Sequence, residues 1–247
     1  MAELDGIWWS SAGEGAAVVV PRLNVDWSSM DLSALTERFR VVIVAPRGFG
    51  PSARPGSYDM SGFVGDVERV LDHLGIESYA TFGYSMNGVM AARLALSSAR
   101  VTAVACGGFP LTADLSGMGD RARARNASAR DDPDEWEEVL ATYDPAAAEA
   151  FWDDVAALPP GALADLDRPL RLWWGEDDAV LASLLSPAQL GRDLDARGIP
   201  YEVVPGLDHD GMLQRLDLEL CAITEWLSRR AERPRHDGDD YRRRDEV

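Results

Sequence analysis

The chain has 247 residues, which is enough for one sizeable domain with a buried core and too short for two comfortable ones. Its 42 acidic residues against 24 basic ones give a formal net charge of −18, which argues against nucleic acid as a partner, because phosphates are bound by clustered basic residues. The same charge repels highly anionic ligands at long range, so we expect a small, largely uncharged substrate and a well-solvated surface.

No apolar run approaches the roughly 18 residues of a membrane-spanning helix, and the chain begins acidic where a secretory signal begins basic. We therefore expect a cytoplasmic protein that does not associate with membranes. The two cysteines, Cys106 and Cys221, lie in apolar segments far apart in the sequence. Two cysteines predict neither a disulfide framework nor a four-ligand zinc site, so we expect two buried free thiols and no metal ion or other cofactor.

The first part of the chain consists of short apolar runs and one helical pattern. Residues 6–11 and 16–21 are strand-like and are separated by the turn at 13–15. The second run is apolar throughout, as in a strand that is buried on both faces. Residues 31–40 have helically spaced apolar side chains, and 41–45 is the next buried strand.

A longer helical pattern covers residues 60–74, and Gly75 ends it where a C-cap glycine is expected. His73 lies in the last turn of this helix. A histidine there interacts favourably with the helix dipole and usually faces solvent, so we expect no catalytic role for it.

The segment around Ser85 is a strand-like run, 80–84, that turns directly into a helical pattern at 86–94. Gly83 has no Cβ to obstruct a sharp bend, and a serine on such a bend is lifted out of the sheet with its hydroxyl exposed. The start of the helix places unpaired backbone N–H groups beside it, and these would stabilise an oxyanion, with the Met86 N–H as the first donor. The segment predicts a nucleophile elbow.

The composition changes after the next strand-like run, 101–106. Residues 111–165 are rich in Ala, Asp and Arg, contain no strand-like run, and predict a small helical insertion over the site. Its aromatic side chains either line a pocket or pack the insertion onto the sheet. The candidate pocket residues are Trp136 and Trp152 within the insertion and Phe109 just before it. The repeated alternation of apolar runs and helices predicts a mostly parallel sheet with helices on both faces.

The candidate acid and base follow the last two strands. The strand-like run 169–175 ends in acidic residues, and a carboxylate at the end of a strand is where the acid that orients a catalytic histidine lies. The last run, 201–205, leads into His209. The remaining histidine, His236, lies in the charged tail, so His209 is the candidate base.

Four segments resemble motifs of the α/β-hydrolase superfamily, and they occur in its order of Ser, Asp and His. Residues 83–88 (Gly-Tyr-Ser-Met-Asn-Gly) resemble the Gly-x-Ser-x-Gly elbow, except that Asn87 replaces the last glycine and Gly88 comes one position later. Residues 46–52 resemble the Asp-x-Arg-Gly-x-Gly-x-Ser loop without its aspartate. The other two motifs are Gly-x-x-Asp, which selects Asp178 with Asp177 as the alternative, and x-Asp-His, which selects His209.

The resemblance implies an α/β-hydrolase fold, in which a mostly parallel central sheet is flanked by helices. The core would comprise residues 1–110 and 166–230, and residues 111–165 would form a small helical cap. Residues 231–247 are charged and nearly free of apolar side chains, and we expect this tail to be disordered.

The resemblance also points to the segment 21–24 as part of an oxyanion hole. In the superfamily a His-Gly pair ends this strand, and the next residue gives the second oxyanion N–H. This chain has Pro-Arg-Leu-Asn instead, so by position Leu23 is the expected donor and Asn24 the alternative. Arg22 either binds a substrate carboxylate or is a surface residue. Tyr84, beside the nucleophile, is a further candidate for the pocket.

Together these residues predict a serine hydrolase that acts on a small ester, lactone or thioester. His209 would take the proton of Ser85 as its oxygen attacks a carbonyl, Asp178 would hold the imidazole, and water would release the acyl-enzyme. A lyase or cyclase that acts on a biosynthetic intermediate is the second hypothesis, because the oxyanion segment is altered. A carbon–carbon hydrolase is a third. A binding protein that shares only the fold is a fourth, and the intact set of serine, acid and histidine argues against it.

Overall fold

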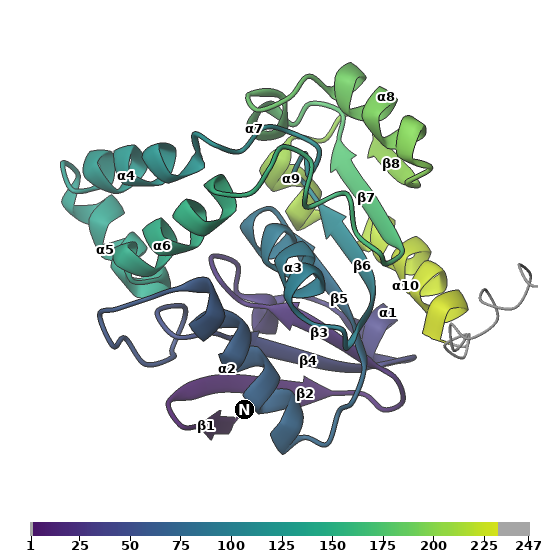
Figure 1. Ribbon diagram of the computed structural model, residues 1–247, viewed down its shortest axis with the longest axis horizontal. Helices are drawn as coiled ribbons and strands as arrows, with labels where there is room; N and C mark the ends of the chain where they lie inside the picture. Colours follow the sequence, from purple (N-terminus) through teal and green to yellow (C-terminus); the bar gives the residue numbers. More distant parts are fainter. Residues whose placement is uncertain (1, 232–247) are drawn as a thin grey trace, which may run out of the picture.

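A computed structural model describes residues 2–231; His236 and the remainder of the expected tail lie outside the described residues. The chain folds around one eight-stranded sheet (Figure 1). The strands are β1 (Ala2–Leu4), β2 (Ile7–Ala12), β3 (Ala17–Pro21), β4 (Arg40–Ala45), β5 (Tyr79–Tyr84), β6 (Val101–Gly107), β7 (Leu170–Gly175) and β8 (Tyr201–Val204). The helices are η1 (Trp27–Ser29, a 3-10 turn), α1 (Ser33–Thr36), α2 (Met60–His73), α3 (Met86–Ser97), α4 (Met118–Ala129), α5 (Pro133–Thr142), α6 (Pro145–Ala156), α7 (Ala179–Ala182), α8 (Pro187–Arg197), α9 (His209–Gln214) and α10 (Asp217–Ala231).

The strand order is β1-β2-β4-β3-β5-β6-β7-β8. The strands from β4 to β8 in this order run parallel, and β1 and β2 form an antiparallel edge beside β4. Strand β3 lies between β4 and β5, with Val18 opposite Val41 on one side and Ala80 on the other. The sheet therefore grows in opposite directions from β3, and ligands of open α/β sheets bind at such a switch point, outside the carboxyl ends of the strands.

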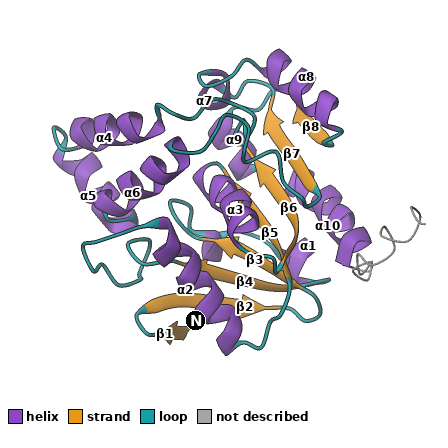
Figure 2. Ribbon diagram, viewed as in Figure 1, coloured by secondary structure: helices purple, strands orange, loops and turns teal. Residues whose placement is uncertain are grey.

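Helices cover both faces of the sheet (Figure 2). One face packs against α2, α3 and α8, and the other against α1, α9 and α10. Successive residues of a strand alternate between the two cores: Val19 and Val42 belong to the first cluster, and Val18 and Val41 to the second. Two buried faces explain why β3 and β4 are apolar throughout.

Three helices, α4 to α6, lie between β6 and β7 and form the projecting part of the molecule near the N-terminal end of α3 (Figure 1). Asp132 and Asp144 begin α5 and α6 by accepting N–H bonds at the N-cap, each followed by a proline at the first helical position. Two contacts hold these helices against the core of the fold. Arg93 of α3 forms an ion pair of 2.8 Å with Asp154 of α6, and the Tyr58 hydroxyl donates a hydrogen bond of 2.6 Å to Asp144.

Two local expectations were wrong. The helically spaced apolar side chains of residues 212–230 predict a single helix, but the segment forms two, since Asp208 caps α9 and the chain bends at Arg215 before α10 begins. Cys221 is exposed rather than buried, because it lies one position beyond Leu220 and so off the buried stripe of α10.

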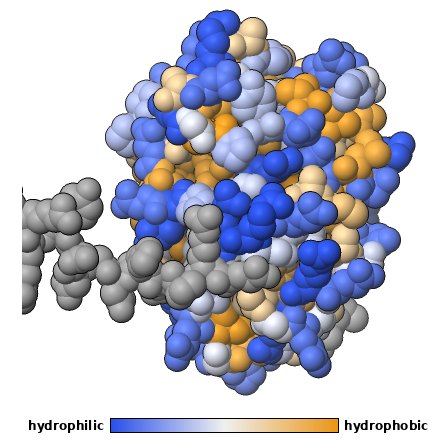
Figure 3. Space-filling model, turned by 90° about the vertical axis from the view of Figure 1, so that its right-hand side faces the viewer, coloured by the Kyte–Doolittle hydropathy of each residue, from blue (hydrophilic) through white to orange (hydrophobic). Residues whose placement is uncertain are grey.

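The side of the molecule that carries α8 and α10 is largely hydrophilic, with separate apolar patches (Figure 3). Such a surface agrees with the large surplus of acidic residues. Within residues 2–231, no helix is long and apolar enough to cross a membrane.

Candidate active site

Ser85 lies at the sharp turn between β5 and α3, at the carboxyl edge of the sheet. Its φ of 55° and ψ of −132° are unusual for a residue with a side chain, and such strain is typical of functional sites. The turn is held by a bond of 2.8 Å from the Ser85 N–H to the Gly107 carbonyl. A Cβ on Gly83 would lie 2.4 Å from the Asn87 carbonyl oxygen, so the bend requires glycine at 83.

The close approach of α3 to the sheet depends on Gly88. A Cβ at this position would lie 2.5 Å from the Cys106 Sγ and 3.1 Å from the Gly83 carbonyl oxygen. Asn87, one position earlier, directs its buried side chain to the segment after β3 instead. The packing that the superfamily pattern assigns to the glycine two places after the serine is therefore supplied one residue later.

Ser85, His209 and Asp178 form a continuous chain of hydrogen bonds. His209 is the first residue of α9, and its Nε2 lies 3.0 Å from the Ser85 Oγ. Its Nδ1 lies 2.8 Å from the Asp178 Oδ2. Asp178 follows β7, is 2% exposed, and accepts a bond of 2.8 Å from the Leu181 N–H with its other oxygen. Asp177 is exposed, and the structure places Asp178 rather than Asp177 against the histidine.

The hydrogen-bond partners fix the tautomer of His209. An ionised carboxylate only accepts, so Nδ1 carries the hydrogen and Nε2 is free to accept the proton of the Ser85 hydroxyl. The buried Tyr84 lies behind the imidazole, and its hydroxyl donates to the His209 carbonyl at 2.9 Å. Burial, reinforced by the Asp178 carboxylate, raises the pKa of Tyr84 and keeps this donor neutral. Tyr84 thus supports the histidine and does not line the pocket, contrary to our expectation.

The segment after β3 differs from expectation at Leu23. Its N–H donates to the Asn87 Oδ1 at 2.7 Å, inside the protein, and so is already engaged. The Asn87 Nδ2 donates to the Asn24 Oδ1 at 2.9 Å and to the Tyr84 carbonyl at 3.2 Å. A backbone N–H can only donate and a carbonyl can only accept, so these two contacts set the orientation of the Asn87 amide. Asn24 must then offer its oxygen to Asn87, and its Nδ2 has no acceptor among the described residues.

A cavity of about 180 Å³ opens beside Ser85 and is lined by Asn24 and Met86 as well. Its apolar wall includes Phe109 and Trp152, two of the expected pocket residues, whose rings stack at 5.6 Å. The cap helix α4 contributes further lining residues, among them Met118, Arg121 and Arg125. The sequence reasoning missed these two arginines, although their spacing of four on one helix could have indicated a shared face.

Two other expected pocket residues lie elsewhere. Arg22 forms an ion pair of 2.9 Å with Asp26 and covers the Trp8 ring at 4.7 Å. Trp136 lies under the Arg130 guanidinium at 4.9 Å. Neither lines the cavity beside Ser85, so for both residues the pocket alternative is wrong.

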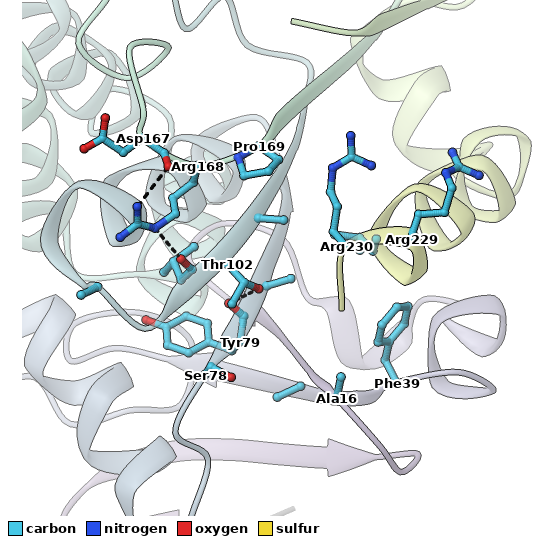
Figure 4. A pocket seen from close by; sticks show the side chains of 16 residues that line it. Ala16, Phe39, Ser78, Tyr79, Thr102, Asp167, Arg168, Pro169, Arg229 and Arg230 are labelled. Atoms are coloured by element: carbon cyan, nitrogen blue, oxygen red, sulfur yellow. Dashed lines mark hydrogen bonds between the residues drawn. The ribbon is translucent and has the colours of Figure 1, made fainter. Parts of the chain in front are cut away.

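A larger hollow of about 990 Å³ lies at the opposite edge of the sheet, at the amino ends of β3, β5 and β6 (Figure 4). Tyr79, Thr102 and Arg168 face it, and the Arg168 Nε donates to the Val101 carbonyl at 2.9 Å. Among the described residues that line it there is no histidine, and Ser85 lies at the other edge. We therefore place the candidate chemistry at the smaller cavity.

Comparisons with known proteins agree with this architecture. Residues 7–219 match the model of the alpha/beta hydrolase family. A protein of Synechocystis sp., provisionally named a non-heme chloroperoxidase, is 32% identical over 85 residues, which are 32% of this chain and 31% of that protein. The match thus spans about a third of the length of this curated relative.

Similar solved structures include a thermophilic esterase from Thermogutta terrifontis, with a TM-score of 0.67 and 22% identity over 90% of this chain and 93% of the other. Another is the enol-lactonase from Burkholderia xenovorans LB400, with a TM-score of 0.60 and 23% identity over 90% and 96% of the two chains. At these identities the likeness shows the fold, and it confirms the fold class predicted from the sequence.

Proposed function

Because this chain belongs to the alpha/beta hydrolase family, we propose that it is a serine hydrolase that cleaves a small ester, lactone or thioester through an acyl-enzyme on Ser85. The observation that carries the proposal is the unbroken hydrogen-bond chain from Asp178 through His209 to the Ser85 hydroxyl. Esterases and an enol-lactonase among the similar structures favour esters and lactones as substrates.

The mechanism follows from the three groups in turn. As the Ser85 Oγ attacks the substrate carbonyl, the His209 Nε2 takes its proton, and Asp178 stabilises the imidazolium that forms. The imidazolium then gives its proton to the leaving oxygen or sulfur, and the acyl group stays on Ser85. A water molecule that loses its proton to His209 attacks the acyl carbonyl; the bond from the acyl carbon to the Ser85 Oγ then breaks, His209 returns the proton to that oxygen, and the acid is released.

The oxyanion formed in both steps needs hydrogen-bond donors beside Ser85. The first is the Met86 N–H, which lies in the first turn of α3, where backbone N–H groups have no partner within the helix. The expected second donor, the Leu23 N–H, is engaged by Asn87. We assign the second position to the side-chain Nδ2 of Asn24, which lines the cavity with Ser85.

The remaining parts of the proposal come from the sequence and from the placement of α4 to α6. These helices act as a cap, with residues 111–165 as its extent, over a core of residues 1–110 and 166–230. The enzyme acts in the cytoplasm on a small molecule rather than on nucleic acid, and it uses no cofactor.

A lyase or cyclase is the second candidate. It would follow if Asn24 gave no hydrogen bond in place of the engaged Leu23 N–H, because an oxyanion hole with Met86 alone disfavours acyl transfer more than a proton transfer by His209. A carbon–carbon hydrolase with the same nucleophile is a third. If Ser85 reacts with a probe for activated serines but the protein releases no product from simple esters, the result favours the second candidate over the first.

The test uses a fluorophosphonate probe and 4-nitrophenyl acetate on the wild type, Ser85→Ala and Ser183→Ala. Ser183 lines the same cavity, and its hydroxyl bonds the Val180 carbonyl, so it is a matched control. We expect labelling and turnover in the wild type and in Ser183→Ala, and neither in Ser85→Ala. Labelling that persists in Ser85→Ala would contradict the assignment of the nucleophile.

A further inference from the structure

Two arginines of the cap face the cavity that contains Ser85. Arg121 and Arg125 are four residues apart on α4, hence on one side of the helix, and both line the cavity. Arg123, between them, faces another direction and pairs with Asp120 at 2.9 Å and Asp153 at 2.8 Å. On this helix, Arg123 thus has acidic partners, whereas Arg121 and Arg125 face the cavity.

Neither Arg121 nor Arg125 has an acidic partner within residues 2–231. The chain has 42 acidic residues against 24 basic ones, so carboxylates to pair with are abundant. Arginines elsewhere use them, as Arg93 does with Asp154 at 2.8 Å and Arg197 with Asp165 at 2.9 Å. Two guanidinium groups without carboxylates at one cavity make a local positive site in an otherwise acidic protein.

The surroundings of these arginines define what they can hold. Tyr143 lines the same cavity as Arg125; burial raises the pKa of Tyr143, and the nearby Arg125 charge opposes that shift, so the two side chains lie close together at this space. Phe109, Trp152 and Met118 make the wall apolar. A volume of about 180 Å³ is below the range of drug-sized pockets and suits a small molecule.

We propose that Arg121 and Arg125 bind a carboxylate at one end of a small substrate, whose carbon chain crosses the apolar wall and presents its ester or lactone carbonyl to Ser85. The guanidinium fork matches the two oxygens of a carboxylate, and two such groups supply donors for both. This inference rests on the proposed serine-hydrolase function and names the substrate class of the same site.

The overall charge of −18 does not prevent such binding. Charges further than about 8 Å from the ligand are largely screened at physiological ionic strength, whereas the two arginines act at contact. We therefore expect the substrate to be a monoanion with an apolar body, rather than the largely uncharged molecule expected from the net charge.

The experiment compares each mono-4-nitrophenyl ester of glutaric, adipic and pimelic acid with its methyl ester, which lacks the negative charge. Spontaneous hydrolysis is measured without enzyme and subtracted. The variants are Arg121→Gln, Arg125→Gln and the double variant. Arg38→Gln is the control, because Arg38 is another exposed arginine without an acidic partner among the described residues, and it does not line the cavity.

We expect the wild type to prefer at least one free acid over its methyl ester. Each cavity variant should lower kcat/KM for that acid about tenfold, mainly through KM, and change it much less for the methyl ester, so that the acid-to-ester ratio falls. Arg38→Gln, which changes the net charge equally, should behave as the wild type. An acid-to-ester ratio that is the same in the wild type and in the double variant would overturn the inference.

Failure of the proposed serine-hydrolase function would give a different experimental result from failure of the arginine site. If Ser85 takes no probe and no ester is cleaved, calorimetric titration with adipate still tests the arginine site. Binding by the wild type that the double variant loses would support the site alone, and equal or absent binding would refute it.

Discussion

The proposed donor Asn24 makes a prediction whose size follows from its contacts. Asn24→Ala removes the Nδ2 group beside Ser85 and leaves the Met86 N–H alone in the oxyanion hole. Loss of one such donor lowers kcat about 10²- to 10³-fold, which is about 2.7 to 4 kcal/mol of transition-state stabilisation. The folded protein loses only the bond of 2.9 Å between Asn87 and Asn24, worth about 0.5 to 1.5 kcal/mol. Asn87 keeps its contacts with Leu23 and Tyr84, so the fold should survive.

The assay is the pre-steady-state acylation rate with 4-nitrophenyl acetate, read beside the thermal midpoint. Asn24→Asp is the matched variant, because it still accepts from Asn87 but places a carboxylate oxygen where the donor stood, and we expect it to be slower than Asn24→Ala. An acylation rate of Asn24→Ala within about threefold of the wild type would refute the reasoning. The second donor would then be a backbone N–H, either that of residue 24 itself or that of Leu23 after release from Asn87.

Two further predictions concern the acid and the thiols. Asp178→Asn should lower kcat with 4-nitrophenyl acetate about 10⁴-fold, because the amide favours the wrong tautomer of His209. Asp177→Asn should leave kcat unchanged, and equal losses in the two variants would contradict the assignment of the acid. The native protein should react with one equivalent of Ellman's reagent, at the exposed Cys221, and with a second only after unfolding, because burial raises the pKa of the Cys106 thiol. Two rapid equivalents in the native protein would show that Cys106 is accessible.

The sequence predicted those features that depend on local pattern. The apolar run of β3 and the turn at Ser85 between strand and helix were recognisable, because burial on both faces and a sharp bend constrain the residue types directly. His209 and Asp178 could be assigned because each follows a strand at the same edge of the sheet and because their segments resemble the x-Asp-His and Gly-x-x-Asp motifs. The relation of these loops to each other follows from the parallel topology.

The features that the sequence did not predict depend on side chains from segments far apart. Leu23 holds the expected position for an oxyanion donor, and only the three-dimensional contact with Asn87, 64 residues away, shows that its N–H is engaged. Tyr84 adjoins the nucleophile in sequence but is buried, and its hydroxyl bonds the His209 carbonyl instead of lining the cavity. Arg22 is drawn to Trp8 and Asp26, and no periodicity of its own segment indicates this.

The place of Gly88 affects how sequences of this kind are recognised. What the elbow requires is a missing Cβ where α3 crosses Gly83 and Cys106, and this chain meets the requirement three residues after the serine. A search pattern that demands glycine at position 87 passes over this chain, although Ser85 stands on a sharp turn between strand and helix. Position 87 is thereby open to a side chain, and Asn87 reaches Leu23 and Asn24 from it, so the contacts of this neighbouring loop can change while the turn that presents Ser85 stays the same.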